Sequence, residues 1–173
     1  SSSAASDVYK RQVFNGFLFS TEFARRCAAS GINIGNAVET PDATDAWQMN
    51  VQILALCNEQ RQNNGLEKLM TREDLWEQVA QVRAGEIVNY FSHTRPNGSS
   101  CFSLYDEAGL DYRAAGENIA AGYYGASAVV DGWMNSTGHR ANILSESYDY
   151  LATGYATGGA YGTNYCQNFL GDW

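Results

Sequence analysis

The sequence is short of positive charge. Its 11 Lys and Arg residues stand against 19 Asp and Glu, which gives a net charge of −8 over 173 residues. Surfaces that bind nucleic acid or anionic lipid need clusters of Lys and Arg. We therefore expect neither kind of partner. Hydrophobic residues make up 45% of the chain, which is typical of a globular protein rather than a disordered one.

Long apolar runs are also missing, so we expect no transmembrane segment. The opening residues 1–12, SSSAASDVYKRQ, have no apolar periodicity, and we interpret them as a leader or tag-like segment. Residues 13–44 contain a short amphipathic stretch that resembles the closing segment of a repeat domain in secreted bacterial proteins. We interpret 13–44 as the tail of an upstream domain plus a linker near Pro41, or alternatively as a helix packed on the main domain. The main domain is then 45–173.

The hydrophobic pattern of residues 45–173 predicts helices first and a β-hairpin last. The periodicity predicts helices and helical turns at 45–64, 71–87, 103–109, 127–136 and 136–144. It predicts strands at 116–121, 150–157 and 161–169, with Gly158-Gly159-Ala160 as the turn of the hairpin. This order is typical of an α+β domain with an antiparallel sheet.

The second predicted helix has a definite start and a definite buried face. We expect Thr71 to open it, with Asp74 three residues later as a variant of the capping box. We expect one buried face along Leu75, Val79, Val82 and Glu86, joined by Trp76, Ala80 and Ile87.

Four short segments of this domain form a recognisable series along the chain. They are NEQRQNNGL (58–66), FSHTRPNG (91–98), GENIAAG (116–122) and WMNSTGHRANIL (133–144). In this order and spacing they resemble the CAP superfamily of cysteine-rich secretory proteins, antigen 5 and plant pathogenesis-related proteins, most closely its secreted bacterial branch. The resemblance implies a three-layer α-β-α sandwich with a small central antiparallel sheet, in a protein that is secreted or held at the cell surface.

The resemblance also implies a cleft centred on three residues. The family cleft holds two histidines and, in animal and plant members, two glutamates. His93, Glu117 and His139 match three of these four positions, and Ser136 stands where the second glutamate would be. A mechanism that needs two carboxylates is therefore not expected.

The same residues stand out without the family. His93 and His139 are the only histidines of the chain, and each lies in a stretch rich in small or turn-forming residues, where functional groups concentrate. Glu117 is placed to orient an imidazole. The alternative is structural: the three side chains tie loops together, Arg140 satisfies carbonyl groups and Asn142 closes a turn. We also expect three residues to lie beside a bound ligand: Ser136, Arg140 and Asn142.

Binding is the function that we expect first. The resemblance implies a small ligand, lipid, glycan or protein as the partner, and a divalent cation such as zinc at His93 and His139. We expect the chain to be a monomer. Glu117 would be a third ligand or an orienting neighbour. The Tyr- and Gly-rich run 122–125 would suit recognition or ordinary packing.

The alternative is a hydrolase, either metal-dependent or built from Ser136 or Ser92 with His139 and Glu117. A purely structural module is the third reading.

The four cysteines lack the CxxC spacing of zinc ribbons and redox motifs. Their even number allows two disulfides in three connectivities, or four buried thiols. We favour a disulfide between Cys101 and Cys166, because both belong to segments expected to border the cleft. Cys57 lies on a core-facing helix and can be unpaired.

Overall fold

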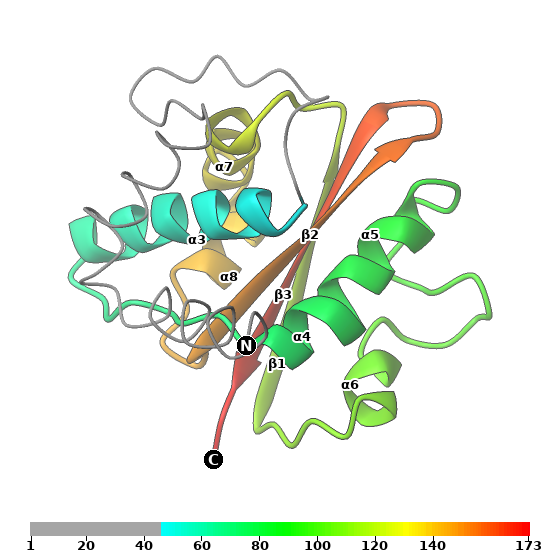
Figure 1. The fold of residues 1–173 in the computed structure, drawn as a ribbon. Helices are drawn as coiled ribbons and strands as arrows, with labels where there is room; N and C mark the ends of the chain where they lie inside the picture. The colour runs from blue at the N-terminus through cyan, green and yellow to red at the C-terminus, as the bar shows by residue number, and fades with distance from the viewer. Residues whose placement is uncertain (1–45) are drawn as a thin grey trace, which may run out of the picture. The chain divides into compact units, whose positions relative to one another are not determined.

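The computed structural model describes residues 46–173 (Figure 1). The leader, the upstream tail and the linker expected over residues 1–44 lie outside the described residues. None of the described helices is long and apolar enough to cross a membrane.

The first described helix, α3 (Ala46–Asn63), follows the predicted range 45–64. Its apolar side chains at three- and four-residue spacing, including Met49, Ile53 and Cys57, are buried in the core. Gly65 has φ +74° directly after the helix, a conformation that favours glycine and ends the helix where the sequence predicted.

The second predicted helix is one helical rod with a wide turn in the middle. It consists of α4 (Glu73–Leu75), the π-helical segment η3 (Trp76–Ala80) and α5 (Gln81–Ile87). The predicted capping box is wrong. Arg72 is the N-cap residue and its side chain makes no capping hydrogen bond. The Asp74 carboxylate instead accepts from the Arg72 guanidinium, with N–O distances of 2.7 and 3.0 Å, and from the adjacent Leu75 backbone N–H at 2.8 Å.

The π turn changes which side chains reach the core. A π turn adds a residue to the helical repeat, so the apolar face rotates after Ala80. Val82 is therefore exposed and Glu86 only half-buried, whereas Arg83 is fully buried. The predicted face holds for Leu75, Val79, Ala80 and Ile87, which are buried, and is wrong for Val82 and Glu86.

The sheet has three antiparallel strands, β1 (Ala114–Ala121), β2 (Tyr150–Gly158) and β3 (Gly162–Gly171). Their order is β1-β3-β2, so β3 lies in the middle and β1 at an edge. This confirms the expected α+β class. Polar and apolar residues alternate along β3, but all of its residues except the first are buried. This is because helices cover both faces of the sheet.

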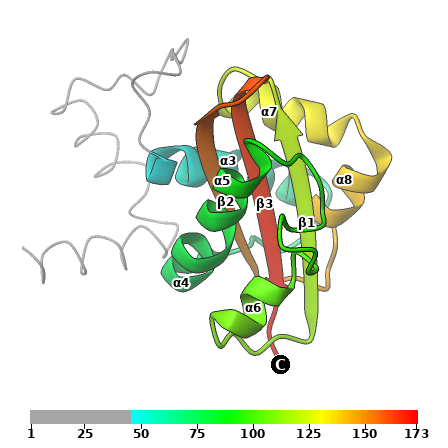
Figure 2. The ribbon, with the colours of Figure 1, turned by 90° about the vertical axis from the view of Figure 1, so that its right-hand side faces the viewer.

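Helices cover both faces of the sheet (Figures 1 and 2). On one face lie α3, α7 (Ala126–Met134) and α8 (Thr137–Ile143); on the other lie the α4–α5 rod and α6 (Ser103–Glu107). Tyr165 and Phe169 of β3 pack in the core cluster on the α3 side, and Cys166 and Leu170 pack on the α5 side. The expected three-layer α-β-α sandwich is thus confirmed.

Side chains close the free edge of β1. Three backbone carbonyls along this edge each accept a hydrogen bond from a side chain of the 133–148 region. The pairs are Tyr148 Oη to Ala115 O at 3.3 Å, Asn142 Nδ2 to Glu117 O at 3.4 Å and Trp133 Nε1 to Ile119 O at 3.5 Å. The edge is therefore occupied by the chain itself rather than left for another strand.

Candidate functional site

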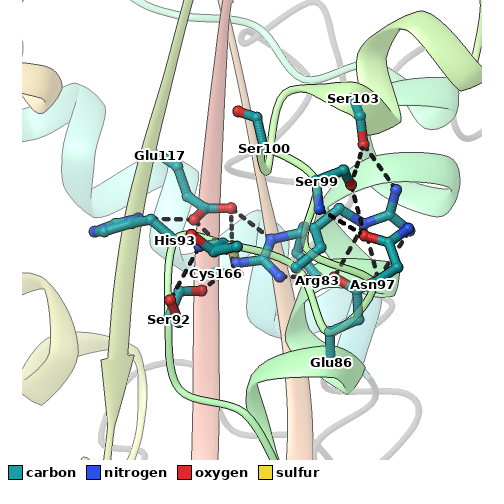
Figure 3. Close-up of polar contacts among 12 residues, drawn as sticks. Arg83, Glu86, Ser92, His93, Asn97, Ser99, Ser100, Ser103, Glu117 and Cys166 are labelled. Atoms are coloured by element: carbon teal, nitrogen blue, oxygen red, sulfur yellow. Dashed lines mark hydrogen bonds and ion pairs between the residues drawn. The ribbon is translucent and has the colours of Figure 1, made fainter.

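The centre of the candidate site is Glu117, in the middle of β1 on the face toward α5. Its side chain is 1% exposed and that of Arg83 is fully buried. Arg83 donates from Nε to Oε2 at 2.8 Å and from Nη2 to Oε1 at 3.2 Å, and the Cys166 thiol donates to Oε2 at 3.3 Å (Figure 3). Both carboxylate oxygens are therefore already engaged by the protein.

These contacts keep Glu117 ionised. Burial alone would raise its pKa, but hydrogen bonds from His93 and Arg83, with the charge of Arg83, outweigh burial and lower the pKa below its ordinary value of 4.5. A carboxylate held in this way is an acceptor and a source of negative charge. It is not suited to donate a proton near neutral pH.

His93 receives its orientation from this carboxylate. Its Nδ1 lies 2.8 Å from Glu117 Oε1. Because the ionised carboxylate only accepts, Nδ1 must be the donor, and a neutral His93 ring then carries its free lone pair on Nε2. The side chain is 58% exposed, so this nitrogen belongs to the open part of the site.

Two arginines, Arg83 and Arg95, hold the loop that carries His93 in place. Arg83 Nη2 donates to the carbonyl of Ser92 at 2.6 Å, so one guanidinium holds both Glu117 and the residue before His93. Arg95, on the other side of His93, forms ion pairs with Glu86 at 2.9 Å and with Glu107 at 2.7 Å. The imidazole thus sits on a rigid support rather than on a free loop.

His139 approaches from α8. Its Nδ1 lies 2.8 Å from Ser136 Oγ, so the serine at the N-terminus of α8 contacts the imidazole instead of capping the helix. Burial, and then the charge of His93, lower the pKa of His139 below its ordinary value of 6.5. A serine hydroxyl donates or accepts, so the contact permits the His139 tautomer with a free Nε2.

An amide network holds α8 against β1. Asn142 Nδ2 donates to Asn118 Oδ1 at 2.8 Å, and Asn118 Nδ2 donates to the carbonyl of His139 at 3.1 Å and to Gln167 Oε1 at 3.0 Å. Asn118 follows Glu117 in the strand, so the two side chains point to opposite faces of the sheet. His93 and His139 are therefore supported from opposite faces and approach the same edge strand.

Some expected roles are not realised. Glu117 bonds to His93 and not to His139, and Ser92 Oγ accepts from the Thr94 backbone N–H at 3.0 Å. The Ser–His–Glu arrangement drawn from the sequence is thus not assembled. Across residues 46–173 there is also no group of three or more His, Cys, Asp or Glu side chains placed to hold a metal ion.

Two smaller expectations about neighbouring residues are corrected. Arg140 is exposed, and the arginine that binds carbonyls is instead Arg61, which donates to the carbonyls of Glu67, Ile143 and Ser145 at 2.6–2.9 Å. Asn142 does not close a turn with its side chain, because that side chain reaches across to β1.

The expected Cys101–Cys166 disulfide is wrong in this structure. Both residues are buried free thiols, as is Cys57, and Cys27 lies outside the described residues. The Cys166 thiol instead donates to Glu117 Oε2 and to Asn168 Oδ1, each at 3.3 Å. The sulfur of Cys166 therefore contacts the carboxylate of Glu117 rather than Cys101.

Sequence reasoning missed Arg83, the residue on which the site rests. Its one signal is the spacing to Glu86, to which it donates at 2.6 Å, but such pairs are ordinary on exposed helix faces. The rotation of the helix at the π turn is what directs the Arg83 side chain toward the sheet, where it contacts Glu117.

Comparisons with known proteins agree with this fold. The curated protein YkwD of Bacillus subtilis, described as uncharacterized, is 33% identical over 150 residues, which cover 86% of this chain and 56% of YkwD. The uncharacterized membrane protein YlbC of the same organism is 38% identical over 128 residues, covering 70% of this chain and 34% of YlbC. The chain therefore spans between about a third and just over a half of the length of these curated relatives.

Solved structures give the same result. An extracellular protein from Bacillus anthracis that contains an SCP domain has a TM-score of 0.65 at 30% identity, covering 79% of this chain and 45% of that one. An outer surface protein from Borrelia burgdorferi has a TM-score of 0.67 at 17% identity, covering 75% of this chain and 97% of that one, and shows the fold alone. The model of the cysteine-rich secretory protein family, CAP, matches residues 54–169. With the sandwich fold and these relatives, that match shows that the chain belongs to the CAP family.

Proposed function

We propose that the chain is a secreted CAP domain that binds a ligand in the cleft of His93, Glu117 and His139, with a divalent cation such as zinc held between the two imidazoles. One observation carries the proposal. Each imidazole has its Nδ1 engaged by the protein, at 2.8 Å from Glu117 and Ser136 respectively, which leaves both Nε2 atoms for an external partner.

The roles within the proposed site follow from the contacts. Neutral imidazole nitrogen is a good ligand for zinc, and the lowered pKa of His139 keeps that ring neutral at physiological pH. Glu117 is fully engaged, so it acts as the orienting partner of His93 and not as a third ligand. With two protein ligands, the rest of the ion's coordination would be supplied by oxygen donors of water or of a bound ligand.

Secretion is part of the same proposal. The family whose model matches residues 54–169 is described as one of secretory proteins. The Bacillus anthracis relative, at 30% identity, is described as an extracellular protein. Both descriptions support a location outside the cytoplasm for this chain.

Calorimetric titration with zinc tests the proposal. We expect the wild-type chain to bind one zinc ion per chain and the His93→Ala/His139→Ala variant to bind none at that site. Thr94→Ala is the matched control, because Thr94 is exposed on the same loop and is not a ligand. Unchanged zinc affinity in the double variant would exclude the site.

A hydrolase is the second candidate, favoured by the Ser136–His139 contact at 2.8 Å, which is the spacing of a nucleophile and its base. His139 is also predominantly neutral at physiological pH, as a base must be, because its pKa is lowered. Casein and peptidoglycan are suitable substrates for a first assay. Hydrolysis that disappears in both Ser136→Ala and His139→Ala would support this candidate, and hydrolysis that survives in either would exclude the pair.

A further inference from the structure

The second edge of the sheet is β2, and parts of the chain outside the sheet occupy it. The strand order β1-β3-β2 leaves β2 with a neighbouring strand on one side only. In an antiparallel pair, the N–H and C=O groups of alternate residues point away from the partner strand. The outward N–H of Leu151 donates to the carbonyl of Met70 at 2.8 Å. The outward N–H of Thr153 donates to Asn50 Oδ1 of α3 at 2.7 Å.

The α4–α5 rod supplies further partners along the same edge. Trp76 Nε1 donates to the Thr153 carbonyl at 3.1 Å. The Gln81 side-chain amide forms both hydrogen bonds that a residue of a paired strand would form with Tyr155. Its Nε2 donates to the Tyr155 carbonyl at 2.8 Å, and its Oε1 accepts from the Tyr155 N–H at 3.1 Å. The rod thus takes the place that a fourth strand would occupy.

The π turn aligns these two side chains with the strand. The Gln81 N–H donates to the carbonyl of Trp76, five residues earlier, which is the bond of a π-helix. This bond brings the two residues toward one side of the rod, whereas residues five apart in a regular α-helix point about 140° away from each other. Gly154 lies between the two capped residues of β2 and lets the rod approach, because a Cβ there would collide with the carbonyl of Ala80.

The sequence of β2 has none of the usual protections of a free edge. Proteins protect edge strands with charged side chains, proline or β-bulges. Residues 150–158, YLATGYATG, contain no Asp, Glu, Lys, Arg or Pro, and they pair with β3 in unbroken register, without a bulge. A regular, uncharged strand of this kind pairs readily with another strand when its edge is free. The protection of β2 therefore depends on the hydrogen bonds that reach it from outside the sheet.

From these contacts we propose that the α4–α5 rod acts as a surrogate edge strand, which prevents β2 from pairing with the β2 edge of a second copy of the chain. Two copies carry the same uncharged edge, so no charge repulsion opposes their antiparallel pairing once the surrogate bonds are removed. The inference concerns self-association and does not depend on the proposed cation site in the cleft.

Size-exclusion chromatography with light scattering at rising protein concentration tests the proposal. We expect the wild-type chain to remain a monomer and Gln81→Ala to form a dimer or a larger species. Gln78→Ala is the matched control, because Gln78 is the same residue type, exposed on the same rod. Gln81→Met also removes both hydrogen bonds but keeps the length of the side chain, so it remains informative if Gln81→Ala unfolds.

Hydrogen exchange of the Tyr155 N–H locates the association. In dilute solutions of either Gln81 variant this amide should exchange about tenfold faster than in the wild type, because it has lost its acceptor. Where the variant associates, the protection should return, because the strand of the second copy supplies a new acceptor. Three results would overturn the proposal: Gln81 variants that stay monomeric up to about 1 mM, equal association of Gln78→Ala, or association that leaves the Tyr155 N–H unprotected.

Discussion

The side chains of Arg83 and Glu117 form an ion pair, 2.8 Å from Nε to Oε2, that is closed to solvent on both sides. A buried charge is stabilised only while its partner keeps the opposite charge. The free energy of the fold and the orientation of His93 thus depend on the same carboxylate.

Acid should weaken the fold through Glu117. Its folded-state pKa is lowered below the ordinary 4.5, so its contribution to stability is present above pH 4.5 and is lost as the pH falls through the lowered value. In Glu117→Gln we expect the free energy of unfolding at neutral pH to drop by about 3 kcal/mol and to depend less on acid. Urea unfolding between about pH 6 and pH 3 measures both.

Glu59→Gln is the control for this prediction, because Glu59 is exposed on α3. It should resemble the wild type at every pH. Equal acid sensitivity of Glu117→Gln and the wild type would contradict the assigned role of the carboxylate.

The tautomer of His93 is a second prediction. Long-range nitrogen–proton NMR should find the neutral ring protonated on Nδ1, because that atom donates to Glu117. The assignment is simple, since the chain has two histidines. In Glu117→Gln the amide donates or accepts, so both tautomers should be populated. A wild-type His93 protonated on Nε2 would show that Glu117 does not orient the ring.

The cysteines give a third prediction. Burial raises the pKa of Cys57 to about 12, and burial with the nearby Glu117 carboxylate raises the pKa of Cys101 to about 11. Cys57, Cys101 and Cys166 should therefore resist alkylation in the native protein and react fully in urea without a reductant. Mass spectrometry counts the alkylated thiols. If two of these three thiols react only after a reductant is added, the two cysteines form a disulfide, which would contradict the prediction.

A fourth prediction concerns the approach of β2 to the π turn. A Cβ on Gly154 would collide with the backbone carbonyl of Ala80, so Gly154→Ala should lower the free energy of unfolding by about 3 kcal/mol. Gly85→Ala is the matched control, because a Cβ there meets nothing within 4 Å and alanine favours the helix by about 1 kcal/mol. The same small effect in both variants would contradict the close packing.

The elements could be predicted from the sequence where the pattern is local. The period of α3, the glycine after it and the glycine-marked hairpin each depend on neighbouring residues, and the structure places them as predicted. The four segments that carry the family resemblance also led to the three-layer sandwich, because their order along the chain is the order of the family fold.

What the sequence did not predict depends on contacts between distant residues. The π turn at Trp76–Ala80 shifts the buried face by one residue, and nothing in the local pattern announces it. The burial of Arg83 follows from that shift. The thiol of Cys166 bonds to Glu117 on the neighbouring edge strand, a partner that the spacing of cysteines does not reveal.

The most direct measurement of the central claim is anomalous diffraction at the zinc absorption edge from crystals of the chain soaked in zinc. We predict a single peak shared by His93 and His139, about 2.0–2.1 Å from each Nε2, with Glu117 still hydrogen-bonded to His93 Nδ1. A peak bound through only one imidazole, a peak on Nδ1, or zinc found only away from both histidines would contradict the proposed site.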